Sequence, residues 1–210
     1  MKNLIIILLC LTSTFSFAQN TTPAFDAHSW KAPYSLALDS WGIERFLLPA
    51  DFAPQIKYTG VEDIRFTKGW GDVKSPEYWS YAFLWFLDGK PEMNSVIIEK
   101  NLGAYYDGLI GRNIDKRKIP AEKITPVKTS ITKIETIAGD FNTFSGTIQM
   151  LDYMEQKPMT LNCIVHLKYC SGQEKTFVFY ELSPQPPTGA VWKTLDQLWK
   201  DFDCKAATTN

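Results

Sequence analysis

Four acidic residues stand close together in the sequence, beside an arginine and several aromatic residues. They are Glu62, Asp63, Asp72 and Glu77, and the arginine is Arg65. Paired carboxylates in such a setting divide the acid and base roles in glycoside hydrolysis. Glu62 and Asp63 are neighbours in an expected strand, so their side chains point to opposite faces and do not form that pair with each other. A carboxylate-based hydrolase of envelope or extracellular glycans is thus the alternative prediction, without assigned catalytic residues.

Cys163 and His166 form a second pattern, because a cysteine near a histidine is typical of a nucleophile beside its base. Residues 161–170 alternate apolar and polar side chains, which predicts a strand. An odd spacing in a strand places Cys163 and His166 on opposite faces. His28 and His166 are the 2 histidines of the chain. We therefore expect no histidine-based triad, no metal site and no cofactor.

The chain begins with features of a secretory signal peptide at residues 1–18. Lys2 precedes an apolar run, and Ser16 and Ala18 supply the small residues that signal peptidase prefers. The run is shorter than the ~20 residues of a membrane-spanning helix. We expect a cleaved signal and export to the periplasm or the extracellular space, with no transmembrane anchor. Lipidation at Cys10 is an alternative, which the bulky Leu9 disfavours.

Three cysteines remain after this cleavage. Along an extended strand, Cys163 and Cys170 lie about 23 Å apart, far beyond the ~7 Å that a disulfide allows. Cys204, just past an expected C-terminal helix, is within reach of one of them. We favour a disulfide between Cys170 and Cys204, because Cys170 lies at the strand end while Cys163 points into the apolar face.

Composition points to no strongly charged partner. The chain has 22 Lys and Arg against 23 Asp and Glu, a formal net charge of −1. One dense basic run, Arg112 with Lys116, Arg117 and Lys118, is interpreted as a solvated connector between a helix and Pro120. We therefore expect no nucleic-acid partner.

The pattern of apolar residues divides the chain into an N-terminal arm at 19–40, a single domain at 41–204 and a flexible tail at 205–210. Helices are expected at 95–110, ending at Gly111, and at 191–202. Strands are expected at 42–48, 61–66, 78–87, 124–137, 141–154, 159–170 and 175–182. This order predicts an α+β fold, a largely antiparallel sheet packed with two main helices as an α/β sandwich.

The segment 78–87 is rich in aromatic residues on both faces of the expected strand, which indicates a central strand covered on both sides. An exposed aromatic platform for sugars is the alternative interpretation. A cleft beside Trp41, Trp70 and Trp79 is the predicted ligand-binding site.

Some blocks of the sequence resemble known proteins. Gly60–Phe66, Gly69–Gly71 and Glu77–Trp85 look like blocks of small uncharacterised exported bacterial proteins with a domain of unknown function. The element order and the closing segment Trp192–Phe202 resemble the Mog1/PsbP-like sandwich, whose members are more often binding or assembly factors than enzymes. This second resemblance implies a binding or assembly factor. We expect a binding or assembly module of the periplasm or cell surface, which would use an exposed sheet face or a cleft to hold an envelope protein, a glycan or an apolar ligand.

Overall fold

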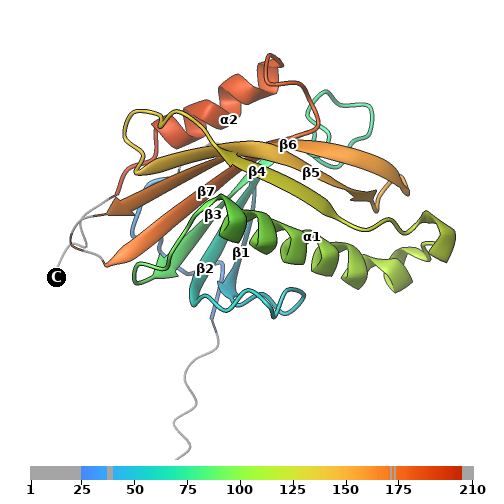
Figure 1. Cartoon of the computed structure of the whole chain (residues 1–210), viewed down its shortest axis with the longest axis horizontal. Helices are drawn as coiled ribbons and strands as arrows, with labels where there is room; N and C mark the ends of the chain where they lie inside the picture. The colour runs from blue at the N-terminus through green and yellow to red at the C-terminus, as the bar shows by residue number, and fades with distance from the viewer. Residues whose placement is uncertain (1–24, 37–39, 171, 173, 205–210) are drawn as a thin grey trace, which may run out of the picture.

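The computed structural model describes residues 25–36, 40–170, 172 and 174–204 (Figure 1). The predicted signal peptide at 1–18 and the predicted tail at 205–210 lie outside these residues. Among the helices of the described part, none has both the length and the apolar character needed to cross a membrane.

One antiparallel sheet of seven strands forms the centre of the molecule, in the order β1-β2-β3-β7-β6-β5-β4. Its last three strands in sequence form the meander that the turns at 155–158 and 171–174 predict. The strands are β1 (Gly42–Leu48), β2 (Gly60–Phe66), β3 (Tyr81–Asp88), β4 (Lys128–Lys133), β5 (Asn142–Asp152), β6 (Lys157–Cys170) and β7 (Lys175–Ser183).

The helices α1 (Ser95–Arg117) and α2 (Ala190–Lys200) lie on opposite sides of this sheet (Figure 1). A short 3-10 helix, η1 (Ala121–Lys123), follows α1. The α+β fold is as expected, and the sheet is antiparallel throughout.

Helix α1 is longer than the sequence indicates. Asn94 caps its start by accepting a hydrogen bond from the backbone N–H of Ile97, and Lys118 ends it in the left-handed conformation. The expected end at Gly111 is wrong, because a glycine inside a helix costs only about 1 kcal/mol and neighbouring turns compensate. The expected connector is therefore helical, and its basic residues Lys116 and Arg117 lie in the last turn, where the helix dipole favours them.

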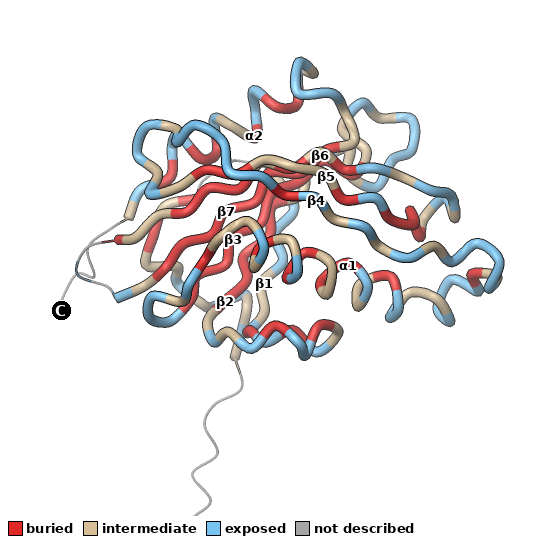
Figure 2. Tube along the Cα trace, in the orientation of Figure 1, coloured by how far each residue is buried: buried red, intermediate tan, exposed pale blue. Residues whose placement is uncertain are grey.

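Strand β3 is buried on both faces, and Figure 2 shows the continuous burial of the central strands. Tyr81, Phe83, Trp85 and Leu87 pack in the core that contains α1. Ala82, Leu84 and Phe86 pack in the core that contains α2. The alternative of an exposed sugar platform is wrong, because these rings are 0–7 % exposed. The strand starts later than expected, at Tyr81, because Trp79 adopts a positive φ of 54° in the preceding turn.

The described part of the N-terminal arm and the C-terminal segment cover the α2 side of the sheet. Tyr34 and Leu36 are buried there, and Ser35 forms a bridge with Asp203. Cys170 and Cys204 are joined by a disulfide with a Cα–Cα distance of 5.9 Å. Cys163 is free and buried in the core on the α1 side.

Candidate ligand-binding site

A cavity of about 80 Å³ lies between α1, the strands β1 to β3 and the loop at 67–80. Most of its wall is aromatic, and we call it the aromatic cavity. It is lined by Glu44, Phe46, Phe52, Ile64, Phe66, Trp70, Trp79, Tyr81, Tyr105, Leu109, Arg112 and Tyr153.

Two of the three predicted ligand-binding tryptophans meet in this wall. The rings of Trp70 and Trp79 pack edge to face with centroids 5.7 Å apart. The Trp79 indole N–H donates to Asp152 Oδ1 at 3.0 Å, which fixes this ring in the core. Trp41 lies elsewhere, against the core on the α2 side. The structure thus brings Trp70 and Trp79 together and separates Trp41 from them.

Trp70 has a polar atom without a partner. Its indole Nε1 is buried and donates to no acceptor within the described residues. A buried N–H that lacks an acceptor costs about 1–3 kcal/mol relative to a satisfied one. Trp70 is also one of the residues that line the aromatic cavity.

The rim of the aromatic cavity carries charge. The Arg112 guanidinium lies 5.1 Å from the centroid of Phe52, and the Arg117 guanidinium lies 4.9 Å from that of Tyr153. Both rings belong to the wall, while Glu44 is the one acid among its lining residues. Arg112 also pairs with Asp51 at 3.7 Å, but both side chains are largely exposed, so this pair is weak. The lining therefore carries one arginine and one glutamate, and Arg117 adds a second positive charge beside the Tyr153 ring.

Glu62 lies behind this wall as a fully buried acid. It accepts hydrogen bonds from Tyr105 Oη at 2.6 Å and from Trp85 Nε1 at 2.9 Å. Burial raises the pKa of the Glu62 carboxyl to about 8, although both hydrogen bonds act to lower it. Both oxygens of this carboxyl are engaged by protein groups.

Asp63 and Arg65 lie on the other face of β2, as the strand alternation requires. Arg65 donates to both carboxylate oxygens of Asp63, which also accepts from Tyr34 Oη at 2.9 Å. The Arg45 Nε lies 3.2 Å from Asp63 Oδ1. This buried network ties the N-terminal arm to β1 and β2, which is a structural role.

The remaining two candidate acids stabilise the loop before β3. Asp72 Oδ1 accepts the backbone N–H of Lys74 at 3.0 Å, and Glu77 Oε2 accepts that of Gly69 at 2.9 Å. Each of the four acids of the sequence pattern therefore has its own protein partners. The hydrogen bonds of these four residues do not join any two of them.

The structure reveals a cluster that the sequence reasoning missed. His166 Nδ1 lies 2.7 Å from Asp140 Oδ2, and His166 Nε2 lies 3.3 Å from Glu181 Oε1. Burial opposes the charged imidazolium, but Asp140 and Glu181 outweigh it and raise the pKa of His166. Asp140 also accepts from Trp199 Nε1 at 2.8 Å, which anchors α2. Cys163 does not take part, because it faces the opposite side of the sheet.

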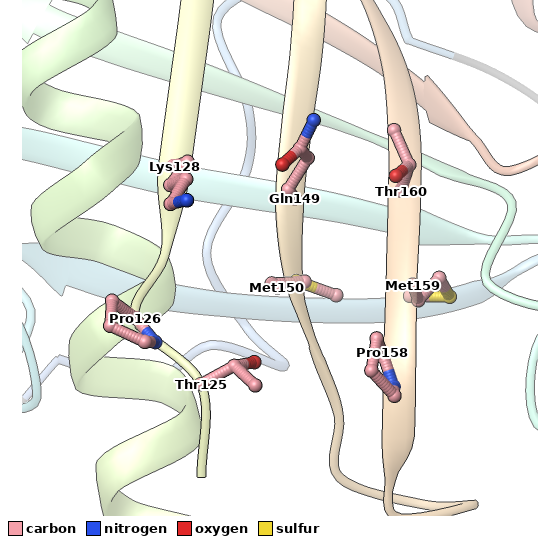
Figure 3. A pocket seen from close by; sticks show the side chains of 8 residues that line it. All are labelled: Thr125, Pro126, Lys128, Gln149, Met150, Pro158, Met159 and Thr160. Atoms are coloured by element: carbon pink, nitrogen blue, oxygen red, sulfur yellow. The ribbon is translucent and has the colours of Figure 1, made fainter.

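A further groove, of about 400 Å³, lies where β4, β5 and β6 meet the segment 125–126 (Figure 3). Lys128, Gln149 and Thr160 cross its three strands in one row, which follows from the strand register. The other lining residues are Thr125, Pro126, Met150, Pro158 and Met159. This groove contains none of the buried, unpartnered polar side-chain atoms found among the described residues, so it is a weaker candidate than the aromatic cavity.

Comparison of the chain with protein-family models, curated proteins and solved structures finds no match.

Proposed function

We propose that this protein is an exported binding module that holds a short acyl chain in the aromatic cavity. The observation that carries the proposal is the buried, unpartnered indole N–H of Trp70 in an aromatic wall. The acyl chain would contact the rings, and its acceptor oxygen would meet Trp70 or the arginines of the rim. Small ligands are commonly recognised in this way, by an apolar wall with a few polar groups.

The size of the cavity limits the ligand. A cavity of about 150 Å³ in another protein holds benzene, and the aromatic cavity has about 80 Å³. A short aliphatic group such as an isobutyl chain is therefore a better match than an aromatic ring or a sugar. We take isovalerate, which joins an isobutyl group to a carboxylate, as the probe.

Export is part of the proposal. It is supported by the signal-like residues 1–18 and by the disulfide between Cys170 and Cys204, because disulfides persist in oxidising compartments. We also propose that the chain has the α/β sandwich of the Mog1/PsbP-like type. The positions of α1 and α2 on opposite sides of the sheet support this.

The contacts of the acids favour binding over hydrolysis. A glycosidase needs two carboxyl groups that face one substrate. Glu62 and Asp63 diverge across β2, while Asp72 and Glu77 cap turns of the loop. The aromatic cavity instead offers apolar surface, one free donor and a basic rim, which suits a binding site.

Thermal unfolding with and without isovalerate tests the proposal. A ligand at about 100 times its dissociation constant adds about 2.7 kcal/mol of stability. Trp70→Phe removes the indole N–H but keeps an aromatic ring, and we expect it to weaken binding about twofold to tenfold, the value of one hydrogen bond. Trp41→Phe is the matched control, because Trp41 packs on the other side of the sheet. The proposal is overturned if isovalerate does not stabilise the unmodified protein. It is also overturned if isovalerate stabilises Trp70→Phe and Trp41→Phe equally.

A further inference from the structure

A second cavity, of about 210 Å³, lies beside α2 on the side of the sheet opposite the aromatic cavity. We call it the α2 cavity. Strands β6 and β7, the segment that leads into α2, and α2 itself contribute its wall. The lining residues are Ile164, Glu181, Pro187, Trp192, Lys193 and Asp196.

Glu181 is the unusual member of this wall. Its side chain is 1 % exposed, and neither carboxylate oxygen makes a hydrogen bond with the described residues. His166 Nε2 lies 3.3 Å from Oε1 but outside hydrogen-bond geometry. The ion pair with His166 therefore leaves the hydrogen-bonding capacity of this buried carboxylate unused, and a further donor would satisfy it.

His166 is not free to move closer to Glu181. Its Nδ1 is held by Asp140 at 2.7 Å, and its ring stacks on Trp199 with centroids 5.0 Å apart. Trp199 is in turn bound to Asp140 by its indole N–H. The imidazole is thus fixed on the side of Oε1, which leaves Oε2 for a second donor.

The rest of the wall indicates the chemistry of that donor. Ile164 and Pro187 are apolar, and the Trp192 indole N–H is already bound to the carbonyl oxygen of Gln185 at 2.9 Å. Trp192 therefore offers the cavity an aromatic surface, which attracts cations. Asp196 adds a second carboxylate, although it also pairs with the exposed Lys200. An acid, an indole and aliphatic groups together are typical of a site for an organic ammonium ion.

A metal ion is a poorer match. Metal ions in proteins are usually held by three or more His, Cys, Asp or Glu side chains. In the described ranges, no such group of three is arranged to hold one. Lys193, which also lines the cavity, is exposed at the surface and forms none of the ion pairs of the described residues.

We propose that the α2 cavity binds a small primary ammonium ion with a short aliphatic chain. The ammonium group donates to Glu181 Oε2, and the chain packs against Ile164 and Trp192. This site is independent of the aromatic cavity, since the sheet lies between the two.

Calorimetric titration of the purified protein with n-butylammonium at neutral pH tests this proposal, with 1-butanol as the uncharged probe of similar shape. We expect saturable binding of the ammonium ion that is at least about tenfold tighter than that of the alcohol, a difference of about 1.4 kcal/mol. Glu181→Gln should lose this preference. Glu122→Gln, which changes an exposed acid in η1, should keep it.

Ile164→Trp provides a second variant that fills the cavity without removing a charge, in case Glu181→Gln does not fold. Ile164 is only half-buried, so the larger ring has room to project into the cavity. We expect this variant to lose ammonium binding while it still binds isovalerate. The proposal is overturned if no saturable ammonium binding occurs, if 1-butanol binds equally well, or if both cavity variants bind as the unmodified protein does.

Discussion

Tyr105 donates a hydrogen bond of 2.6 Å to Glu62, and this bond joins α1 to β2 directly behind the aromatic cavity. The Tyr105 ring is part of the cavity wall, whereas Glu62 is buried beyond it. The position of one wall residue therefore depends on a carboxyl group whose pKa burial raises to about 8. The stability of the protein and the shape of the cavity are linked to the same acid.

The first prediction is that the protein loses stability as pH rises from about 4.5 to about 8. Glu62 has an ordinary pKa of 4.5 in the unfolded chain and about 8 in the folded protein. Between these values the folded state binds more protons than the unfolded state, so the free energy of unfolding falls by up to about 1.4 kcal/mol per pH unit. Chemical denaturation across this range measures the slope.

Glu62→Gln is the variant that isolates this effect. The amide does not ionise, so its stability should change less with pH, and its advantage over the unmodified protein should grow toward pH 8. If both proteins show the same slope, Glu62 is not the group responsible.

The second prediction compares two glycines of α1. A Cβ atom at Gly108 would overlap the backbone oxygen of Phe52, which belongs to the segment beside the aromatic cavity. Gly108→Ala should therefore cost about 1–3 kcal/mol by overpacking and weaken isovalerate binding. Gly111 has no neighbour within 4 Å of such an atom, so Gly111→Ala should stabilise the helix by about 0.5–1 kcal/mol. Denaturant unfolding of both variants measures these changes. Equal stability of the two variants would show that the contact between Gly108 and the Phe52 backbone does not limit the residue at this position.

The third prediction concerns Asp140, which accepts hydrogen bonds from Thr143 and Trp199 and binds His166. Asp140→Asn should destabilise the protein by about 3–5 kcal/mol, the usual cost of breaking a buried ion pair. Burial would raise the pKa of Asp140, but His166 and the hydrogen bonds from Thr143 and Trp199 lower it from 3.8. Burial would lower the pKa of His166, but the two carboxylates beside it raise it from 6.5. The pair therefore stabilises the fold fully between these two values, and its contribution is lost at more acidic and more basic pH.

Unfolding of the unmodified protein and of the Asp140→Asn variant at several pH values provides the measurement. The unmodified protein should exceed the Asp140→Asn variant in free energy of unfolding by the largest amount between about pH 4 and 6.5. A difference that does not vary with pH would show that Asp140 acts through its neutral hydrogen bonds alone.

The fourth prediction concerns the disulfide between Cys170 and Cys204, which are 34 residues apart in sequence. Closing a loop of this length stabilises a protein by about 3–4 kcal/mol in the chain-entropy model. Cys204→Ser should therefore lower stability by this amount. Free Cys163 is buried on the other side of the sheet, so it should not replace Cys204 as a partner. If the unmodified protein is equally stable under reducing and oxidising conditions, the disulfide does not have this role.

Much of the fold follows from the period of apolar residues in the sequence. The two apolar faces of 78–87 predict the central place of β3, and the stripe of Trp192, Leu195 and Trp199 predicts a docked α2. The end of α1 was not predictable from Gly111, because packing of Ile114 after it keeps the chain helical. Strand β4 is shorter than expected, since propensity alone does not show where pairing with β5 stops.

The residues that form the two sites were harder to predict from the sequence than the fold. Trp70 and Trp79 meet because the intervening loop folds back, with the backbone N–H of Trp79 bound to the carbonyl of Trp70. Glu181 and His166 are diagonal neighbours only through the register of β6 and β7, in which Glu181 pairs with Ile164. A correct register for the meander would have revealed this cluster, because both residues then fall on the same face.

The most direct test of the acyl-binding proposal follows the indole N–H of Trp70 by NMR during titration with isovalerate. We predict a saturable change in this signal, because the ligand supplies the acceptor that Trp70 Nε1 lacks. The same titration of Leu109→Phe should give no change, since the larger side chain fills the cavity that Leu109 lines. An unchanged Trp70 signal at saturating isovalerate, or an equal change in the filled variant, would contradict the proposed site.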